Sequence, residues 1–325
     1  MMAYLFIALA GGCAAALMFA SVASGAAISL LLFYLAPLPL MVVAIGWGAL
    51  LAIISGGAVA IGLGLIFSLP YGIAFAAMVA LPAGWLGRLA LLGRPQRSGL
   101  LSDSGAAPDT MAMEWYPVGR ILLWIAGFAA LTTMGALLTL GQDAPTITAA
   151  LRSGLLQVIG ASEPAALGDI ELKIDMAVSI APAAAGIVAM LTLLLNLWLA
   201  AKITAISGRL HRPWPELKNA DLPSMTLAAL CAAIAFCFTG GLPAMLAEIV
   251  TALLMTAYAL AGFAVLHTLT MTLKARAIWL CCAYAAVMAT GWPILAMVAL
   301  GIADSIFGLR QRYRKKRSPP PLPAS

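Results

Sequence analysis

Two carboxylates lie inside strongly apolar segments of the sequence, and their chemistry needs an explanation. Glu248 lies in the segment 240–269, and Asp304 lies in the segment 300–312. A charged side chain inside a bilayer is costly, so it usually faces a cavity or a partner and marks a path for a solute or a proton. The two acids therefore indicate solute binding or proton transfer, provided that lipid surrounds these segments.

The position of Glu248 near a helix end leaves two interpretations open. Gly240, Gly241 and Pro243 predict that a helix begins there, because proline is favoured at the first helical position. Glu248 follows Pro243 by five residues, so it lies about 8 Å below that end of the helix. One interpretation is a substrate-binding carboxylate, and the other is an interfacial glutamate in contact with water.

Asp304 and Asn196 are the other polar residues that we consider inside membrane segments. Asp304 precedes Arg310 by six residues, which places it about 9 Å from the opposite face and roughly 13 Å in height from Glu248. Two acids so far apart do not share a proton, so we expect Asp304 to pair with a cytoplasmic Arg or Lys, or to cap a neighbouring helix. The Asn196 side chain is predicted to form a hydrogen bond to a neighbouring helix. A second hypothesis is that Asn196 and Glu248 bind a substrate.

The composition shows what surrounds these residues. Of the 325 residues, 63% are hydrophobic and 9% are charged, whereas a soluble protein is about half apolar and about a quarter charged. The apolar runs are continuous, as in membrane helices, and do not alternate as barrel strands do. We predict an all-α, polytopic integral membrane bundle of about eight to ten membrane helices, including short or broken ones.

Breaks in the apolar pattern divide the chain. We predict a single membrane domain over 1–309 and a basic, proline-rich, disordered cytoplasmic tail over 310–325. Its long loops are predicted near 94–116, 141–171 and 208–222. Residues 3–93 fit either five helices near 3–23, 26–36, 39–54, 56–69 and 70–92, or four straight spans. Further helices are expected near 117–140, 172–207, 223–239 and 243–267, followed by a hairpin within 277–309.

The loop 141–171 contains a predicted interfacial helix. Ile147, Leu151, Leu155 and Val158 recur at helical spacing, with polar residues on the other side of the turn. A helix of this kind lies in the plane of the membrane surface. A soluble cap over the bundle is the alternative interpretation.

Basic residues predict the orientation of the chain. Sixteen of the 18 Lys and Arg fall in one set of loops and helix ends, and only Arg152 and Lys173 fall on the other side. The positive-inside rule places the basic side and the C-terminus in the cytoplasm. An even number of crossings before Arg94 would place the N-terminus there too. Residues expected to set topology or contact lipid are Arg209, Arg212, Trp214, Arg310, Arg312 and Arg314.

No motif in the sequence indicates an enzyme, a cofactor or a metal. The five cysteines form no CxxC pair, and His211 and His267 are far apart in the sequence. The chain has no phosphate-binding loop, no HExxH and no nucleophile paired with a base. The basic tail lacks a folded module for nucleic acid. We therefore predict a non-enzymatic protein with no cofactor, no metal and no nucleic-acid partner.

The first apolar segment carries a stripe of small residues. Ala8, Gly12, Ala16 and Ala20 are spaced by four, so they share one face of a helix. Small residues allow helix backbones to approach closely. The stripe indicates either packing within the bundle or docking of a partner membrane subunit.

Two stretches, Asn196–Leu217 and Leu300–Arg312, together with the early sequence LAPLPL, carry a resemblance. They resemble the YybS-like family of predicted bacterial membrane proteins, a domain of unknown function, over most of the chain except the tail. More distantly, the chain is similar to the substrate-binding subunits of energy-coupling-factor vitamin transporters, helical bundles that dock to a partner through small-residue stripes. This resemblance implies a bacterial inner-membrane location and a loose match of Ala8, Gly12, Ala16 and Ala20 to a docking stripe.

These observations lead to one functional expectation and one alternative. We expect a small-solute or vitamin-like transport component without its own ATPase. Its partners would be the lipid bilayer, a small solute and other membrane subunits. The alternative is a non-enzymatic structural or assembly protein of the cell envelope.

Overall fold

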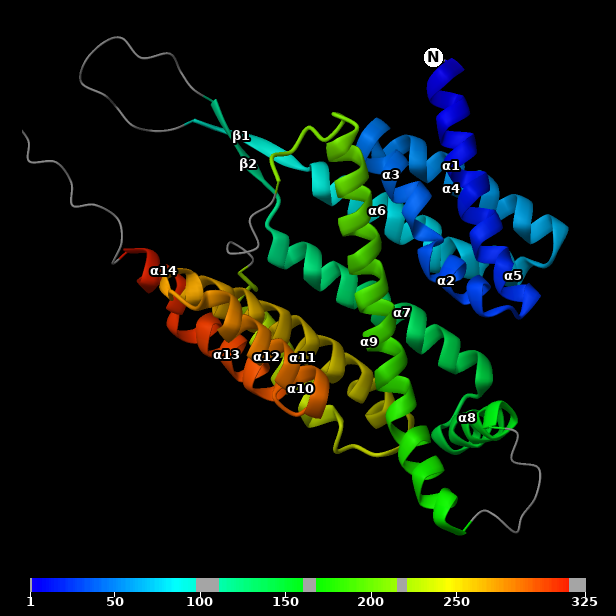
Figure 1. Cartoon of the computed structure of the whole chain (residues 1–325). Coiled ribbons are helices and arrows are strands. Elements are labelled where there is room, and N and C mark those ends of the chain that lie inside the picture. The colour runs from blue at the N-terminus through cyan, green and yellow to red at the C-terminus, as the bar shows by residue number, and fades with distance from the viewer. Residues whose placement is uncertain (1, 98–110, 160–167, 215–220, 316–325) are drawn as a thin grey trace, which may run out of the picture. The chain divides into compact units, whose positions relative to one another are not determined.

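The computed structural model describes residues 2–97, 111–159, 168–214 and 221–315 (Figure 1). Within these ranges, seven helical segments are long and apolar enough to cross a membrane. They are Tyr4–Ser24, Ala27–Trp47, Ala49–Ile66, Leu69–Leu91, Val118–Leu140, Glu171–Ile206 and Gly241–Leu269. Shorter apolar helices at Met225–Phe236, Arg276–Thr290 and Ile294–Phe307 add to them. The protein is therefore an all-α, multi-pass membrane protein, as predicted.

The chain divides into two compact units. Unit 1 consists of residues 1–117 and 191–215, and unit 2 consists of residues 118–190 and 216–325. The single membrane domain predicted over 1–309 includes residues of both units and stays a prediction. The 39-residue helix α9 (Gly168–Ile206) contributes its first part to unit 2 and its last part to unit 1. Hydropathy identifies each span, but it does not show which spans pack against one another.

Unit 1 contains the first four spans. Its helices are α1 (Met2–Ala20), α2 (Ala27–Leu35), α3 (Pro37–Trp47), α4 (Ala49–Ile66), α5 (Leu69–Phe75) and α6 (Leu81–Leu91), with a 3₁₀ turn at Ser21–Ser24 and a π turn at Ala76–Ala80. By length and composition these helices form four candidate spans, as in the four-span alternative, while α2 and α3 remain separate helices, as in the five-helix prediction. The predicted helix 39–54 is instead interrupted at Gly48, whose φ of 112° is open to glycine but strained for other residues.

A short hairpin follows α6 in the loop predicted at 94–116. Strands β1 (Gly93–Arg97) and β2 (Met111–Trp115) pair antiparallel, with Gly93 opposite Trp115 and Arg94 opposite Glu114. The Arg94 Nε donates to Glu114 Oε2 at 2.9 Å, and both side chains are exposed. The polar loop is therefore partly ordered by backbone pairing, which propensity alone did not predict.

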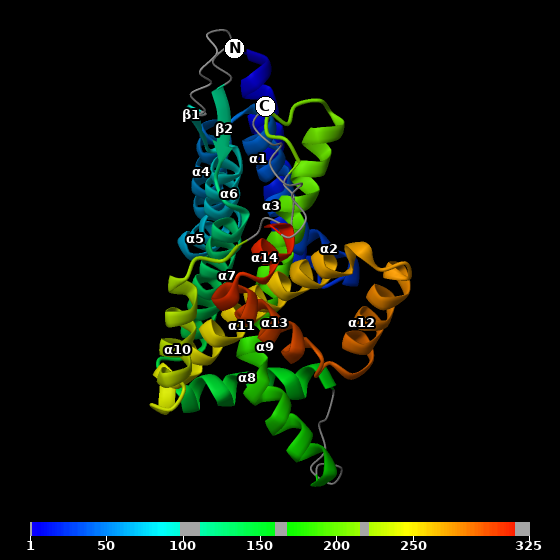
Figure 2. The ribbon, with the colours of Figure 1, turned by 90° about the vertical axis from the view of Figure 1, so that its left-hand side faces the viewer.

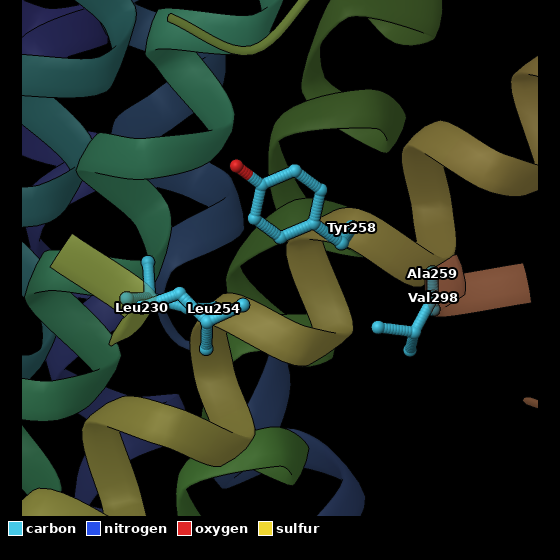
Figure 3. Close-up of a cluster of buried hydrophobic side chains, with 5 residues drawn as sticks. All are labelled: Leu230, Leu254, Tyr258, Ala259 and Val298. Atoms are coloured by element: carbon cyan, nitrogen blue, oxygen red, sulfur yellow. The ribbon is translucent and has the colours of Figure 1, made fainter. Parts of the chain in front are cut away.

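Unit 2 holds the remaining helices. They are α7 (Val118–Leu140), α8 (Ala144–Ile159), the start of α9, α10 (Met225–Phe236), α11 (Gly241–Leu269), α12 (Arg276–Thr290), α13 (Ile294–Phe307) and α14 (Leu309–Lys315), with a 3₁₀ turn at Thr270–Thr272. Gly291, with φ of 73°, separates α12 from α13, so the predicted hairpin is present. Leu230, Leu254, Tyr258, Ala259 and Val298 bring α10, α11 and α13 together in one buried cluster (Figure 3).

Two glycines set the distance between α11 and α13. A Cβ added to Gly262 would overlap the carbonyl oxygen of Met297, and one added to Gly301 would overlap that of Tyr258. Each glycine therefore presses against the backbone of the facing helix, which is the arrangement that small residues allow between membrane helices.

Helix α14 differs from the prediction for the C-terminal tail. The disordered tail was predicted to begin at Arg310, but the helix runs from Leu309 to Lys315. The composition of this segment is basic and polar, so it gave no sign of burial. The ion pair of Arg310, described below, supplies the ordering contact. The rest of the predicted tail, 316–325, lies outside the described residues.

Helix α8 lies crosswise to α7 in unit 2 (Figure 2). Ile147 is fully buried and Leu151 and Leu155 are half-buried, whereas Val158 is 86% exposed. The guanidinium of Arg152 bonds to Asp175 and, at 3.5 Å, to Glu171 on α9. Three of the four predicted apolar positions thus face the protein to some degree. Residues 160–167 of the predicted loop lie outside the described part of the chain.

The start of α8 gives a prediction about pH. Asp143 Oδ1 accepts a hydrogen bond from the Thr146 amide at 2.8 Å, and this bond lowers the pKa of Asp143. A lowered pKa means that the carboxylate stabilises the folded state above its unfolded pKa of about 3.9 and loses this effect as the pH falls. In the wild type, we expect the protection of the Thr146 amide against hydrogen exchange to decrease as the pH is lowered. In Asp143→Asn, this protection should change less with pH. Equal pH dependence in both proteins would contradict the assignment.

Candidate functional site

The end of α13 brings a carboxylate and a guanidinium together. Gly308 ends this helix with φ of 61°, and its amide donates to the Asp304 carbonyl at 2.8 Å. The turn places Arg310 over Asp304. Asp304 Oδ1 accepts from the Arg310 amide at 2.8 Å, and Oδ2 accepts from the Arg310 Nε at 2.7 Å. Asp304 therefore both pairs with Arg310 and caps the first turn of α14.

Asp221 adds a second carboxylate from a distant part of the sequence. The Arg310 Nη2 lies 2.8 Å from Asp221 Oδ1 and 2.7 Å from Asp304 Oδ2. The chain at Asp221 is held against α7, because a Cβ on Gly119 would overlap the Asp221 carbonyl oxygen. We call Asp221, Asp304 and Arg310 the charge cluster. It joins α13, α14, α7 and the segment before α10.

Burial makes the Asp304–Arg310 pair energetically important. The side chains of Arg310 and Asp304 are 3% and 6% exposed, whereas that of Asp221 is 57% exposed. Removing one partner of a buried pair leaves an uncompensated charge, which costs about 3–5 kcal/mol. Asp221 is solvated enough that its contribution is smaller.

A cavity of about 410 Å³ lies beside the charge cluster. Its volume falls in the range of about 300–1,000 Å³ that is usual for small-molecule sites. Polar groups come from the charge cluster and from Ser224, Ser305 and Gln311. The apolar wall includes Leu222, Ala261, Ile306 and Phe307. The lining can therefore offer carboxylate, hydroxyl and amide groups beside an apolar surface.

The prediction that Asp304 pairs with a basic residue is confirmed, and its partner is Arg310. The same contact corrects the prediction that Arg310 contacts lipid, because its side chain is buried in the protein. Residue spacing predicted that the two groups lie near the same end of their helix. It did not show that the glycine turn at Gly308 would fold Arg310 back onto Asp304.

Glu248 does not line the cavity. It is an exposed residue of α11, whereas Ala261, which does line the cavity, follows it by thirteen residues, or about 20 Å along the helix. Among the described residues, none forms an ion pair or a hydrogen bond with Glu248. Its exposure fits the interpretation of an interfacial glutamate, and its role in substrate binding stays a prediction.

Asn196 has a structural environment within unit 1. Its side chain is fully buried, and its Nδ2 donates to the carbonyls of Tyr34 and Thr192, each at 2.8 Å. Tyr34 precedes the helix break at Pro37, where a backbone carbonyl needs a partner from a neighbouring helix. Asn196 supplies this bond, as expected for an amide between helices.

The small-residue stripe of α1 packs within unit 1. Ala8 and Gly12 are buried, and Ala16 and Ala20 are half-buried. Ala8 joins a cluster with Val43, Ala44 and Ala52. A Cβ on Gly12 would lie 3.0 Å from the Val59 side chain of α4. These contacts favour intramolecular packing over docking of a partner subunit.

The other residues predicted to contact lipid differ in exposure. Arg209, Trp214 and Arg312 are exposed, and Arg212 is half-buried. The guanidinium of Arg212 donates to the carbonyls of Ala90 and Tyr116, each at 3.1 Å, and burial lowers its pKa. Arg212 therefore ties together the ends of α6, β2 and α9. The side chain of Arg314 lies outside the described part of the chain.

The structure adds residues that the sequence did not single out. Asp221, Ser224, Ser305 and Gln311 all line the cavity. Asp221 lies in a polar loop, where a carboxylate is ordinary, and a serine in a membrane helix is also common. Only the three-dimensional contact with Arg310 distinguishes Asp221 from other loop acids.

No family model, no curated protein and no solved structure matches the chain.

Proposed function

We propose that this protein is a small-solute transport component of a bacterial inner membrane, without its own ATPase, and that the cavity beside the charge cluster receives the solute. The observation that carries the proposal is a cavity of about 410 Å³ with two carboxyl side chains and one guanidinium side chain in its lining, at the end of apolar helices. Ionisable groups in such a setting usually serve a solute or ion pathway.

The proposed orientation places both termini and the cavity on the cytoplasmic side. Support comes from the sixteen of 18 basic residues assigned to one set of loops and helix ends. It also comes from the four spans before the β hairpin, which return the chain to the side where it began. Arg310 lines the cavity, and it is one of the sixteen basic residues assigned to the cytoplasmic side.

The lining favours a small polar solute. Asp304 has both oxygens occupied by Arg310, whereas Asp221 Oδ1 contacts Arg310 and its side chain remains more than half exposed. Asp221, Ser224, Ser305 and Gln311 are therefore the groups that hydrogen-bond the solute. In this proposal, the Asp304–Arg310 pair positions Asp221 and does not itself bind the solute.

Filling the cavity tests this proposal. Native mass spectrometry of the full chain from a mild detergent extract is expected to show a retained small molecule. Ser305→Phe should remove it, because the new ring occupies the cavity. Ser179→Phe is the matched control, since Ser179 is an exposed serine of α9 outside the cavity lining. No retained molecule in the wild type, or equal retention in both variants, would contradict the solute site.

A structural or assembly role is the second candidate. It is favoured by the Asp304–Arg310 pair, because the carboxylate and the guanidinium hydrogen-bond to each other and need no ligand as a partner. In that case, the extract would contain a protein complex but no small molecule. Ser305→Phe would then leave the complex unchanged, whereas a variant that breaks the ion pair would dissociate it.

A further inference from the structure

We propose that the end of unit 1 formed by α3 and α9 binds the headgroups of anionic phospholipids through Lys202 and Arg209. This inference is independent of the cavity in unit 2. It rests on how these two cations are held, on the partners they lack among the described residues, and on their place at the ends of membrane spans.

Lys202 is held by aromatic rings. Its Nζ lies 4.3 Å from the centroid of the Trp214 ring and 5.9 Å from that of Trp198. Both indoles are partly exposed, at 41% and 48%. Lys202 lies four residues before the end of the Glu171–Ile206 span, or about 6 Å along the helix. Its ammonium group therefore lies in the region where indoles and lysines meet headgroups.

Arg209 is held in a similar way by a different span. Its Cζ lies 4.6 Å from the centroid of the Trp47 ring, and Trp47 is the last residue of the Ala27–Trp47 span. Gly208, with φ of 67°, ends the helical path of α9 and turns Arg209 back toward α3. A Cβ added to Gly46 of α3 would lie 3.9 Å from a side-chain carbon of Arg209. The guanidinium thus stays beside the end of α3.

Neither cation is paired with an acid among the described residues, whereas Arg94, Arg152 and Arg310 are. Arg94 pairs with Glu114, Arg152 pairs with Glu171 and Asp175, and Arg310 pairs with Asp304. Arg212 donates to two backbone carbonyls. Lys202 and Arg209 are exposed and keep donors for an outside anion. At the end of a membrane span, the phosphate of an anionic lipid is the anion within reach.

The expected effect follows from the surface potential of anionic lipid. Each basic residue near such a surface contributes about 1 kcal/mol, which corresponds to about fivefold in affinity and to roughly 30-fold for two residues. Phosphatidylglycerol titrated against the full chain in detergent micelles should therefore bind more tightly than phosphatidylcholine. Lys202→Gln/Arg209→Gln should reduce the phosphatidylglycerol affinity by roughly 30-fold, measured by native mass spectrometry.

Two variants separate a headgroup site from general charge and from misfolding. Arg94→Gln/Arg152→Gln removes the same number of charges from acid-paired residues and should change the affinity little. Lys202→Arg/Arg209→Lys keeps both charges and should retain tight binding. Equal binding of the two lipids by the wild type would overturn the proposal. An equal loss in the acid-paired control, or failure of the charge-preserving variant, would also overturn it. Displacement of the lipid by inorganic phosphate at equal concentration would assign the site to a free anion and overturn the lipid assignment.

Discussion

Arg310→Gln is expected to lower the free energy of unfolding by about 3–5 kcal/mol. The substitution leaves the carboxylate of Asp304 6% exposed and without its cation. It also removes the guanidinium that links Asp304 to Asp221, so the end of α13, α14 and the segment before α10 lose their shared contact. The measurement is denaturant unfolding of the purified chain in detergent micelles.

Arg94→Gln is the control for this effect. It breaks a pair in which the two side chains are 79% and 48% exposed, and such surface pairs contribute about 0–1 kcal/mol. A double variant, Asp304→Leu/Arg310→Leu, should recover much of the loss, because no buried charge then remains unpaired. If Arg310→Gln lowered the free energy of unfolding no more than Arg94→Gln does, the conclusion that the Asp304–Arg310 pair is buried would be contradicted.

Gly301→Ala is expected to destabilise unit 2 by about 1–3 kcal/mol through overpacking. The added methyl group would overlap the carbonyl oxygen of Tyr258, which belongs to a helix backbone and cannot rotate away. Helix α13 must then move away from α11, which loosens the buried cluster around Tyr258 and Val298. Gly262→Ala should act in the same direction, because its methyl group meets the Met297 carbonyl.

Gly127→Ala is the matched control for these glycines. A Cβ on Gly127, in the middle of α7, meets nothing within 4 Å. Alanine is favoured over glycine in a helix by roughly 0.5–1 kcal/mol, so this variant should be slightly stabilised. Opposite signs for Gly301→Ala and Gly127→Ala in the same unfolding assay would confirm that helix contact, rather than helix propensity, decides the result. A stabilised Gly301→Ala would contradict the close packing of α11 and α13.

The apolar helices could be located from sequence because hydropathy is a local property, although the prediction of eight to ten membrane helices did not separate the seven long segments from the three shorter ones within the described residues. Proline and glycine also marked the right places, since Pro37 begins α3 and Gly291 separates α12 from α13. The prediction for 39–54 was wrong because an isolated glycine is often tolerated within a helix. Here Gly48 adopts a φ of 112° and ends α3. Only the backbone conformation distinguishes these two cases.

The candidate site was predictable only in part, because its contacts are not all local. The Asp304–Arg310 pair spans six residues, and the sequence correctly indicated an acid beside a basic helix end. Asp221 is more than 80 positions earlier in the chain, and no pattern within its own loop indicates Arg310 as its partner. Asn196 and Tyr34 are similar, since their bond joins residues 162 positions apart. Such long-range pairs depend on which helices meet.

The short spacing between Asp304 and Arg310 matters for how the chain enters the membrane during synthesis. An unpaired aspartate inside an inserting helix is costly, by roughly 2.5–3.5 kcal/mol at the helix centre and by less near the end, where Asp304 lies. Arg310 leaves the ribosome only six residues after Asp304, and both lie in one helix–turn–helix segment. The acid can therefore acquire its counter-ion before the final helix is released, so that the segment inserts with these two charges neutralised.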